Sequence, residues 1–167
     1  MAAGLIAATL WLARLAWRKQ VGRYIVGLMG RREAITAGLK TVDGVVLLLS
    51  QGDVKGLLAF VASESEERRA IAEVAGSMRI EASELADLAL PKRLWPLADK
   101  LGEAASLLAE QLRGVGESEG EAVLDALAGL DLGSVRGALA EADGEIATVS
   151  ADYDVTDAAV YGGGLYI

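Results

Sequence analysis

The sequence predicts an all-α protein, in which an amino-terminal membrane-associated helix is followed by an irregular bundle of short helices. Hydrophobic residues make up 53% of the chain and aromatic residues only 5%. Ala, Leu and Val therefore supply most of the apolar content, which suits packed helices better than strands. The two prolines both lie in the short segment 91–96, so long helices are permitted almost everywhere else. Apolar residues also recur at helical spacing along the body.

The amino-terminal segment differs from the rest of the chain in charge. Residues 1–40 carry seven Lys or Arg and one acid, whereas the other 127 residues carry nine bases and 23 acids. Residues 1–13 form an uncharged apolar run that ends just before the first base. A membrane would place such a run in lipid and the bases at anionic headgroups. The sequence therefore predicts a membrane anchor over 1–20, single-pass in the cell membrane. Because the bases follow the run, the body is expected in the cytoplasm.

The anchor is short for a span. Thirteen residues cover about 20 Å of the ~30 Å hydrocarbon core, and extension through Trp17 gives about 25 Å if Arg14 snorkels outward. Two alternatives stay open: a helix lying in the membrane interface, and a helix buried against protein, including a partner protein. The predicted membrane-contact residues are Trp11, Arg14, Trp17, Arg18, Lys19 and Arg23. Arg31 and Arg32 extend this basic collar against anionic lipid headgroups.

The segment 21–50 is predicted to be a basic juxtamembrane helix that continues into the bundle. Its apolar positions recur at helical spacing, and Gly27 and Gly30 are places where it could bend. The expected core positions are Val21, Ile25, Leu28, Met29, Ile35, Leu39, Val42, Val46 and Leu49.

Residues 51–149 are predicted to form an acidic helical bundle. Its expected helices are 54–62, one capped by Ser63 that ends near 89, 97–113, 121–130, and 132–149 with Asp131 as N-cap. The predicted core face of 97–113 comprises Leu97, Leu101, Ala104, Leu108 and Leu112.

Two segments are candidate contacts for a protein partner. The first is L-P-K-R-L-W-P, in which Lys92 and Arg93 adjoin Trp95. It is either a rigid connector whose Trp95 plugs the bundle end or a docking corner for an acidic partner. The second is the carboxy-terminal tail 150–167, which is either disordered or docks through its apolar end. The candidate contacts in that end are Leu165, Tyr166 and Ile167.

The composition excludes most catalytic constellations. Cys and His are both absent, which removes thiol nucleophiles, the usual general base and most transition-metal ligands. Acids along 64–87 are interleaved with Arg68, Arg69 and Arg79, a mixture typical of a solvated helix face. The glycine-rich run 114–120 lacks a Lys and carries acids, so it does not resemble a phosphate-binding loop. We therefore expect neither a cofactor nor a metal.

These observations favour a non-enzymatic interaction or scaffold protein on the inner face of a membrane. Its expected partners are membrane lipids and a protein, and small residues at spacing four near the amino terminus permit a homo-oligomer. Nucleic acid is not an expected partner, because residues 41–167 have a net charge of −14. One alternative is a small carboxylate-based bundle that binds a ligand or cation, or acts as an enzyme. Another is a helical accessory subunit whose first helix packs into a partner protein.

Overall fold

The computed structural model describes residues 2–52, 54–62, 65–153 and 155, with side chains given from Trp11 onward except Ala13. All regular secondary structure among the described residues is helical, which confirms the all-α prediction. The elements are α1 Ala2–Gln51, α2 Val54–Val61, α3 Glu66–Asp87, the 3-10 helix η1 Lys92–Leu94, α4 Trp95–Glu117, α5 Ala122–Ala128 and α6 Leu132–Tyr153.

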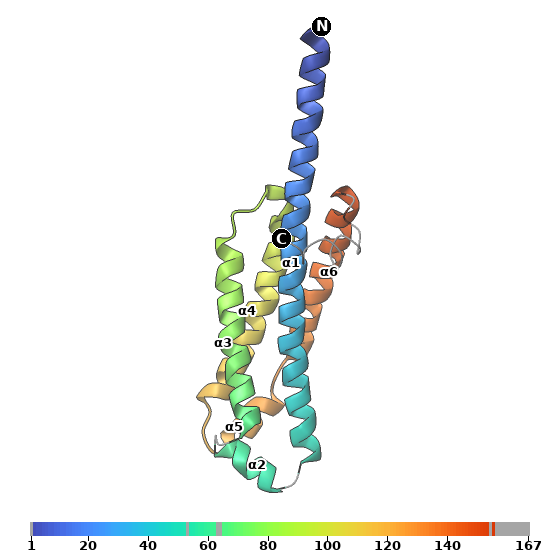
Figure 1. The fold of residues 1–167 in the computed structure, drawn as a ribbon. Helices are drawn as coiled ribbons and strands as arrows, with labels where there is room; N and C mark the ends of the chain where they lie inside the picture. Colours follow the sequence, from blue (N-terminus) through green and yellow to red (C-terminus); the bar gives the residue numbers. More distant parts are fainter. Residues whose placement is uncertain (1, 53, 63–64, 154, 156–167) are drawn as a thin grey trace.

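Four of these helices form an up-down-up-down bundle (Figure 1). α1 and α4 run in one direction and α3 and α6 in the other, so that each neighbouring pair is antiparallel. α4 packs extensively on both α3 and α6, and α1 closes the bundle by contacting α3 and α6. The short helices α2 and α5 both lie at the end of the bundle opposite the amino terminus.

The bundle is held by one apolar core to which all four long helices contribute. α4 buries one face along its whole length, from Leu97 to Val115, and the five core positions predicted for it are all buried. On α1 the buried residues include Val21, Ile25 and Ile35. Near the end of α1, however, it is Val45 and not the predicted Val46 that is buried, while Val46 packs at the margin.

α1 is one continuous helix of 50 residues, about 75 Å long. The helix continues through Gly27 and Gly30, where a bend was predicted, and both glycines are on its exposed side. A helical glycine weakens the helix by about 1 kcal/mol relative to Ala, but it does not by itself break the hydrogen-bond ladder. Buried side chains before and after this region hold the helix against the bundle.

Helix caps explain where three helices begin. The N-cap of α3 is Ser65, whose Oγ accepts a hydrogen bond from the backbone N–H of Arg68 at 3.1 Å. The expected cap at Ser63 is thus wrong by two residues. α4 has Pro96 in its first turn, where the missing N–H is not needed. Asp131 caps α6 as predicted, because its Oδ1 accepts from the backbone N–H of Ser134 at 3.1 Å.

Ion pairs fasten α1 to both of its neighbours. Arg31 Nη1 lies 2.6 Å from Glu81 of α3, and Arg31 Nη2 lies 2.8 Å from Glu84. On the opposite flank, two nitrogens of Arg32 contact the two carboxylate oxygens of Asp143 of α6, each at 2.8 Å. Both guanidinium groups are therefore used within the bundle. This placement differs from their expected position in a collar against lipid.

The predicted single-pass membrane protein is wrong. Within the residues that the structure describes, no helix is both long enough and apolar enough to cross a membrane. The physical reason is the spacing of charge along α1, where Arg14, Arg18 and Lys19 follow the 13-residue apolar run within two turns. A span needs about 20 consecutive, predominantly apolar residues. The predicted cell-membrane localisation and the predicted cytoplasmic placement of the body both depended on that span, so they are wrong for the same reason.

Candidate functional site

The amino-terminal part of α1 projects beyond the bundle as a free-standing helix (Figure 1). We call residues 2–20 the arm. Among the side chains that the structure describes on α1, Val21 is the first that is buried, and those from Trp11 to Gln20 are exposed. The arm rises about 28 Å above this point. It is the least covered part of the fold and is therefore the first candidate for a binding site.

The arm presents large apolar side chains to solvent. Trp11 is 63% exposed and Leu12 is 59% exposed, and Leu15 and Trp17 are also exposed. Trp11 and Leu15 lie one turn apart on the same side of the helix, whereas Trp17 lies on another side. A group of large exposed apolar side chains on one short segment is a typical mark of an interaction surface.

The arm is also strongly basic. Arg14, Arg18 and Lys19 are exposed on it, Arg23 is exposed just beyond it, and residues 1–32 contain no acid. The arm therefore has a positive field that its own side chains do not neutralise. Contact of Trp11, Trp17 and these four bases with anionic headgroups stays a prediction, and it no longer follows from a membrane span.

The bases that continue the sequence into the bundle behave differently. Burial lowers the pKa of Arg31, but hydrogen bonds to Glu84 and Glu81 and their charges raise it more, so its pKa lies above the usual value. The side chain is only 23% exposed. Arg31 and Arg32 thus pair with acids of the bundle, whereas the bases of the arm are exposed.

The polar groups around Trp95 find their interaction partners within the chain. Trp95 Nε1 donates to the carbonyl of Leu90 at 3.0 Å, and Arg93 forms an ion pair with Asp152 of α6. Lys92 Nζ lies 5.9 Å from the centre of the Trp95 ring. Trp95 is 50% exposed, whereas Leu94 is fully buried. Leu94 therefore fills the position at the bundle end that was expected for Trp95.

The candidate contacts in the tail, Leu165, Tyr166 and Ile167, lie outside the described residues. α6 extends to Tyr153, four residues past the predicted end of the last helix. The tail prediction for 156–167 stays a prediction.

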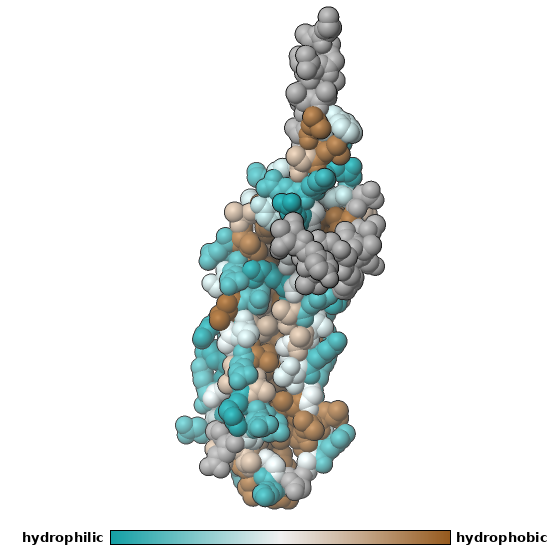
Figure 2. Space-filling model, viewed as in Figure 1, coloured by the Kyte–Doolittle hydropathy of each residue, from teal (hydrophilic) through white to brown (hydrophobic). Residues whose placement is uncertain are grey.

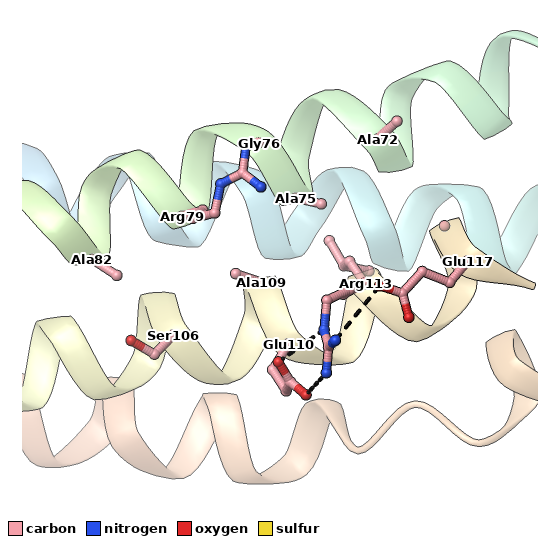
Figure 3. Close-up of a pocket in the computed structure, with 12 residues that line it drawn as sticks. Ala72, Ala75, Gly76, Arg79, Ala82, Ser106, Ala109, Glu110, Arg113 and Glu117 are labelled. Atoms are coloured by element: carbon pink, nitrogen blue, oxygen red, sulfur yellow. Dashed lines mark hydrogen bonds and ion pairs between the residues drawn. The ribbon is translucent and has the colours of Figure 1, made fainter.

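A shallow groove of about 450 Å³ lies between α3 and α4 (Figure 3). Half of its twelve lining residues are Ala or Gly, namely Ala72, Ala75, Gly76, Ala82, Ala109 and Gly116. Arg113 turns toward Glu110 and Glu117 at one end of it. The hydrogen bond from Arg113 lowers the pKa of Glu110. Within the described part of the chain, no group of three acids is placed to hold a metal ion.

Sequence reasoning missed a second exposed apolar surface, at the far end of the bundle. Leu47 and Leu48 in the last turns of α1, and Val54 and Leu58 in α2, are each more than half exposed. Figure 2 shows hydrophobic residues gathered at this end of the molecule. Only Val46 and Leu49 of the run V-V-L-L-L before the turn were predicted as core positions, and no role was given to the other three residues. The signal that could have identified it is that five consecutive apolar residues occupy every side of a helix, including the side facing solvent.

The site is therefore defined by geometry within this chain alone. No protein-family model, curated protein or solved structure matches the chain.

Proposed function

We propose that this chain is a non-enzymatic interaction protein, an accessory or adaptor subunit whose bundle presents the arm to a protein partner. One observation carries the proposal: the arm extends α1 beyond the bundle with Trp11, Leu12, Leu15 and Trp17 exposed on it. Docking of the arm in a partner's groove would remove these side chains from water, which is favourable in proportion to the apolar area buried.

The arm has the features of a preorganised ligand. The bundle fixes the helix from Val21 onward, so the arm continues an existing helix and does not need a new nucleus. Less conformational entropy is then lost on binding. Trp and Arg are the residue types that most often dominate interface energies, and the arm carries two of each, Trp11, Trp17, Arg14 and Arg18. The absence of acids favours a partner groove with an acidic rim.

The interior of the bundle supports a role without catalysis. Among the described residues, the buried side chains are apolar except for Ser65, which caps α3. An active site needs converging polar groups in a pocket. Half of the residues that line the α3–α4 groove are Ala or Gly, and three of its four charged residues, Glu110, Arg113 and Glu117, pair with one another.

The proposal can be tested by crosslinking from the arm. Because the chain has no Cys, Ala16→Cys places a single thiol on the arm for a photoactivatable crosslinker, and Ser77→Cys places one on the exposed side of α3 as the matched control. Both variants are the full chain, used in extracts of cells that express it. We expect Ala16→Cys to give a discrete crosslinked protein that Ser77→Cys does not give.

The product should also depend on the arm's aromatic side chains. Adding Trp11→Ala and Trp17→Ala to Ala16→Cys should abolish it, whereas adding Trp95→Ala, a partly exposed Trp on the bundle, should not. Identical products from the two labelled positions, or a product that survives loss of both arm tryptophans, would contradict the proposal.

A further inference from the structure

The end of the bundle opposite the arm is an apolar surface with acidic surroundings. We call it the foot and define it as residues 44–52, 54–58 and 114–135, which include the first five residues of α2 and all of α5. The exposed apolar side chains at this end are Leu47, Leu48, Val54 and Leu58. Like the arm, the foot exposes several large apolar side chains close together, and such exposed apolar surface is typical of a contact site.

The charges of the foot and the arm are opposite. The foot contains five acids and one base, Lys55, whereas the arm contains three bases and no acid. Glu119, Glu121 and Asp125 are exposed on the foot. Two other foot acids are used locally, because Glu117 pairs with Arg113 and Asp131 caps α6. Enough negative charge remains to attract a basic helix.

The two surfaces cannot meet within one molecule. Trp11 and Leu47 lie on the same continuous helix, and 36 residues at 1.5 Å per residue separate them by about 54 Å. Pairing of two arms would place three bases against three bases, which is unfavourable. Within the described residues, the foot of another copy is a surface that complements an arm in both hydrophobicity and charge.

We propose that the arm of one copy docks on the foot of the next, so that the protein assembles head to tail into linear chains. This inference rests on the proposed function, because it names a second copy as the partner of the arm. A contact between two different surfaces is heterologous: each copy retains one free arm and one free foot, and growth continues unless the rotation between copies closes a ring. The arm tryptophans supply the apolar anchors, and the foot acids orient the basic helix.

Sedimentation velocity of the purified full chain tests this proposal. We expect species larger than a dimer as the protein concentration rises, with weaker association at high salt because part of the attraction is screened. The arm variant Trp11→Ala/Leu15→Ala and the foot variant Leu47→Ser/Leu48→Ser should each weaken self-association about tenfold or more. Ile80→Ser is the matched control, since Ile80 is an exposed apolar residue on α3, and it should leave association unchanged.

Mixing the two variants distinguishes this contact from a symmetric one. The arm variant keeps its foot and the foot variant keeps its arm, so an equimolar mixture should give a one-to-one heterodimer that does not grow. A charge swap provides a second test. Arg18→Glu/Lys19→Glu and Glu119→Lys/Glu121→Lys should each impair association, and the chain carrying all four changes should recover it.

Three outcomes would overturn the proposal. They are a monomer at every concentration, a dimer that is insensitive to the foot variant, and a failure of the mixed variants to pair. If the chain is monomeric but arm crosslinking in extracts still gives its specific product, the inference fails and the proposed function stands. If the arm substitutions alter neither self-association nor crosslinking, both fail.

Discussion

The two parts of α1 have the same backbone and opposite surroundings. From Val21 onward, one face of the helix is buried and ion pairs flank it on both sides, whereas the described side chains of the arm are all exposed. The buried part repeats its apolar residues along one face, but Trp11 and Trp17 lie on different sides of the arm. The comparison shows that a helix can propagate well beyond the surface that stabilises it, and that continuity of secondary structure is no evidence of shared packing.

The largest expected difference between the two parts is in the cost of removing an apolar side chain. Ile35 is fully buried, so Ile35→Ala should lower the free energy of unfolding by about 2–5 kcal/mol. Leu15→Ala on the arm should change it by no more than about 0.5 kcal/mol. Urea unfolding followed by circular dichroism, at concentrations low enough to keep the chain monomeric, measures both. A comparable loss from Leu15→Ala would show that the arm packs on the bundle.

Glycines in α1 give a second, smaller contrast. A Cβ at Gly38 would lie 3.2 Å from Val74 Cγ1 of α3, whereas a Cβ at Gly27 would meet nothing within 4 Å. Gly38→Leu should therefore overpack the α1–α3 interface and destabilise the bundle by about 1–3 kcal/mol. Gly27→Ala should stabilise it by about 0.5–1 kcal/mol through helix propensity alone. Thermal unfolding of the two variants should show shifts of opposite sign, and two shifts of the same sign would contradict the placement of these residues.

The bases of α1 should differ in a third way. Arg31→Met removes a partly buried ion pair with Glu81 and should destabilise the bundle by up to about 1 kcal/mol, less at high salt. Arg18→Met on the arm should leave the stability unchanged and weaken only binding. A double-mutant cycle of Arg31→Met with Glu81→Gln in urea isolates the pair. A coupling energy of zero at low salt would exclude a stabilising contribution from it.

The smallest expected effect is on acid sensitivity, which only the bundle should show. Hydrogen bonds from the hydroxyl and backbone N–H of Ser134 lower the pKa of Asp131 in the folded state. A lowered carboxyl pKa stabilises the fold above the unfolded-state pKa, and this contribution is lost as the pH falls through the folded-state pKa. Asp131→Asn keeps a good N-cap but does not titrate there. Its urea midpoint should fall less than that of the unmodified chain between about pH 5 and pH 3, and equal falls would contradict the assignment.

Much of the bundle could be predicted from local patterns. The start of α2 at Val54, the cap at Asp131 and the buried face of α4 all depend on residues close together in the sequence, and the structure confirms them. Choosing between Ser63 and Ser65 was harder, because the repeated S-E-S-E offers two similar caps. The choice depends on how the chain enters α3, which the pattern does not contain.

The arm and foot could be predicted only in part. The composition identified Trp11, Trp17 and the neighbouring bases as a contact surface, but a membrane was inferred from an apolar run that is too short on its own. The pairing of Arg32 with Asp143 joins residues 111 positions apart, and no local pattern indicates it. Leu47 and Leu48 were not among the predicted core positions, but their exposure as a contact surface was not predicted either, because burial depends on which helices cover α1.

The continuity of α1 has a consequence for how such an arm can change. Because each residue advances the helix by about 1.5 Å and turns it by about 100°, one residue inserted near Gln20 would rotate Trp11 by more than a quarter turn relative to the bundle. Seven inserted residues would lengthen the arm by about 10 Å and return its side chains to nearly the same direction. The length of the arm and the direction of its side chains are thus set by how many residues separate them from the bundle, independently of the sequence that folds the bundle.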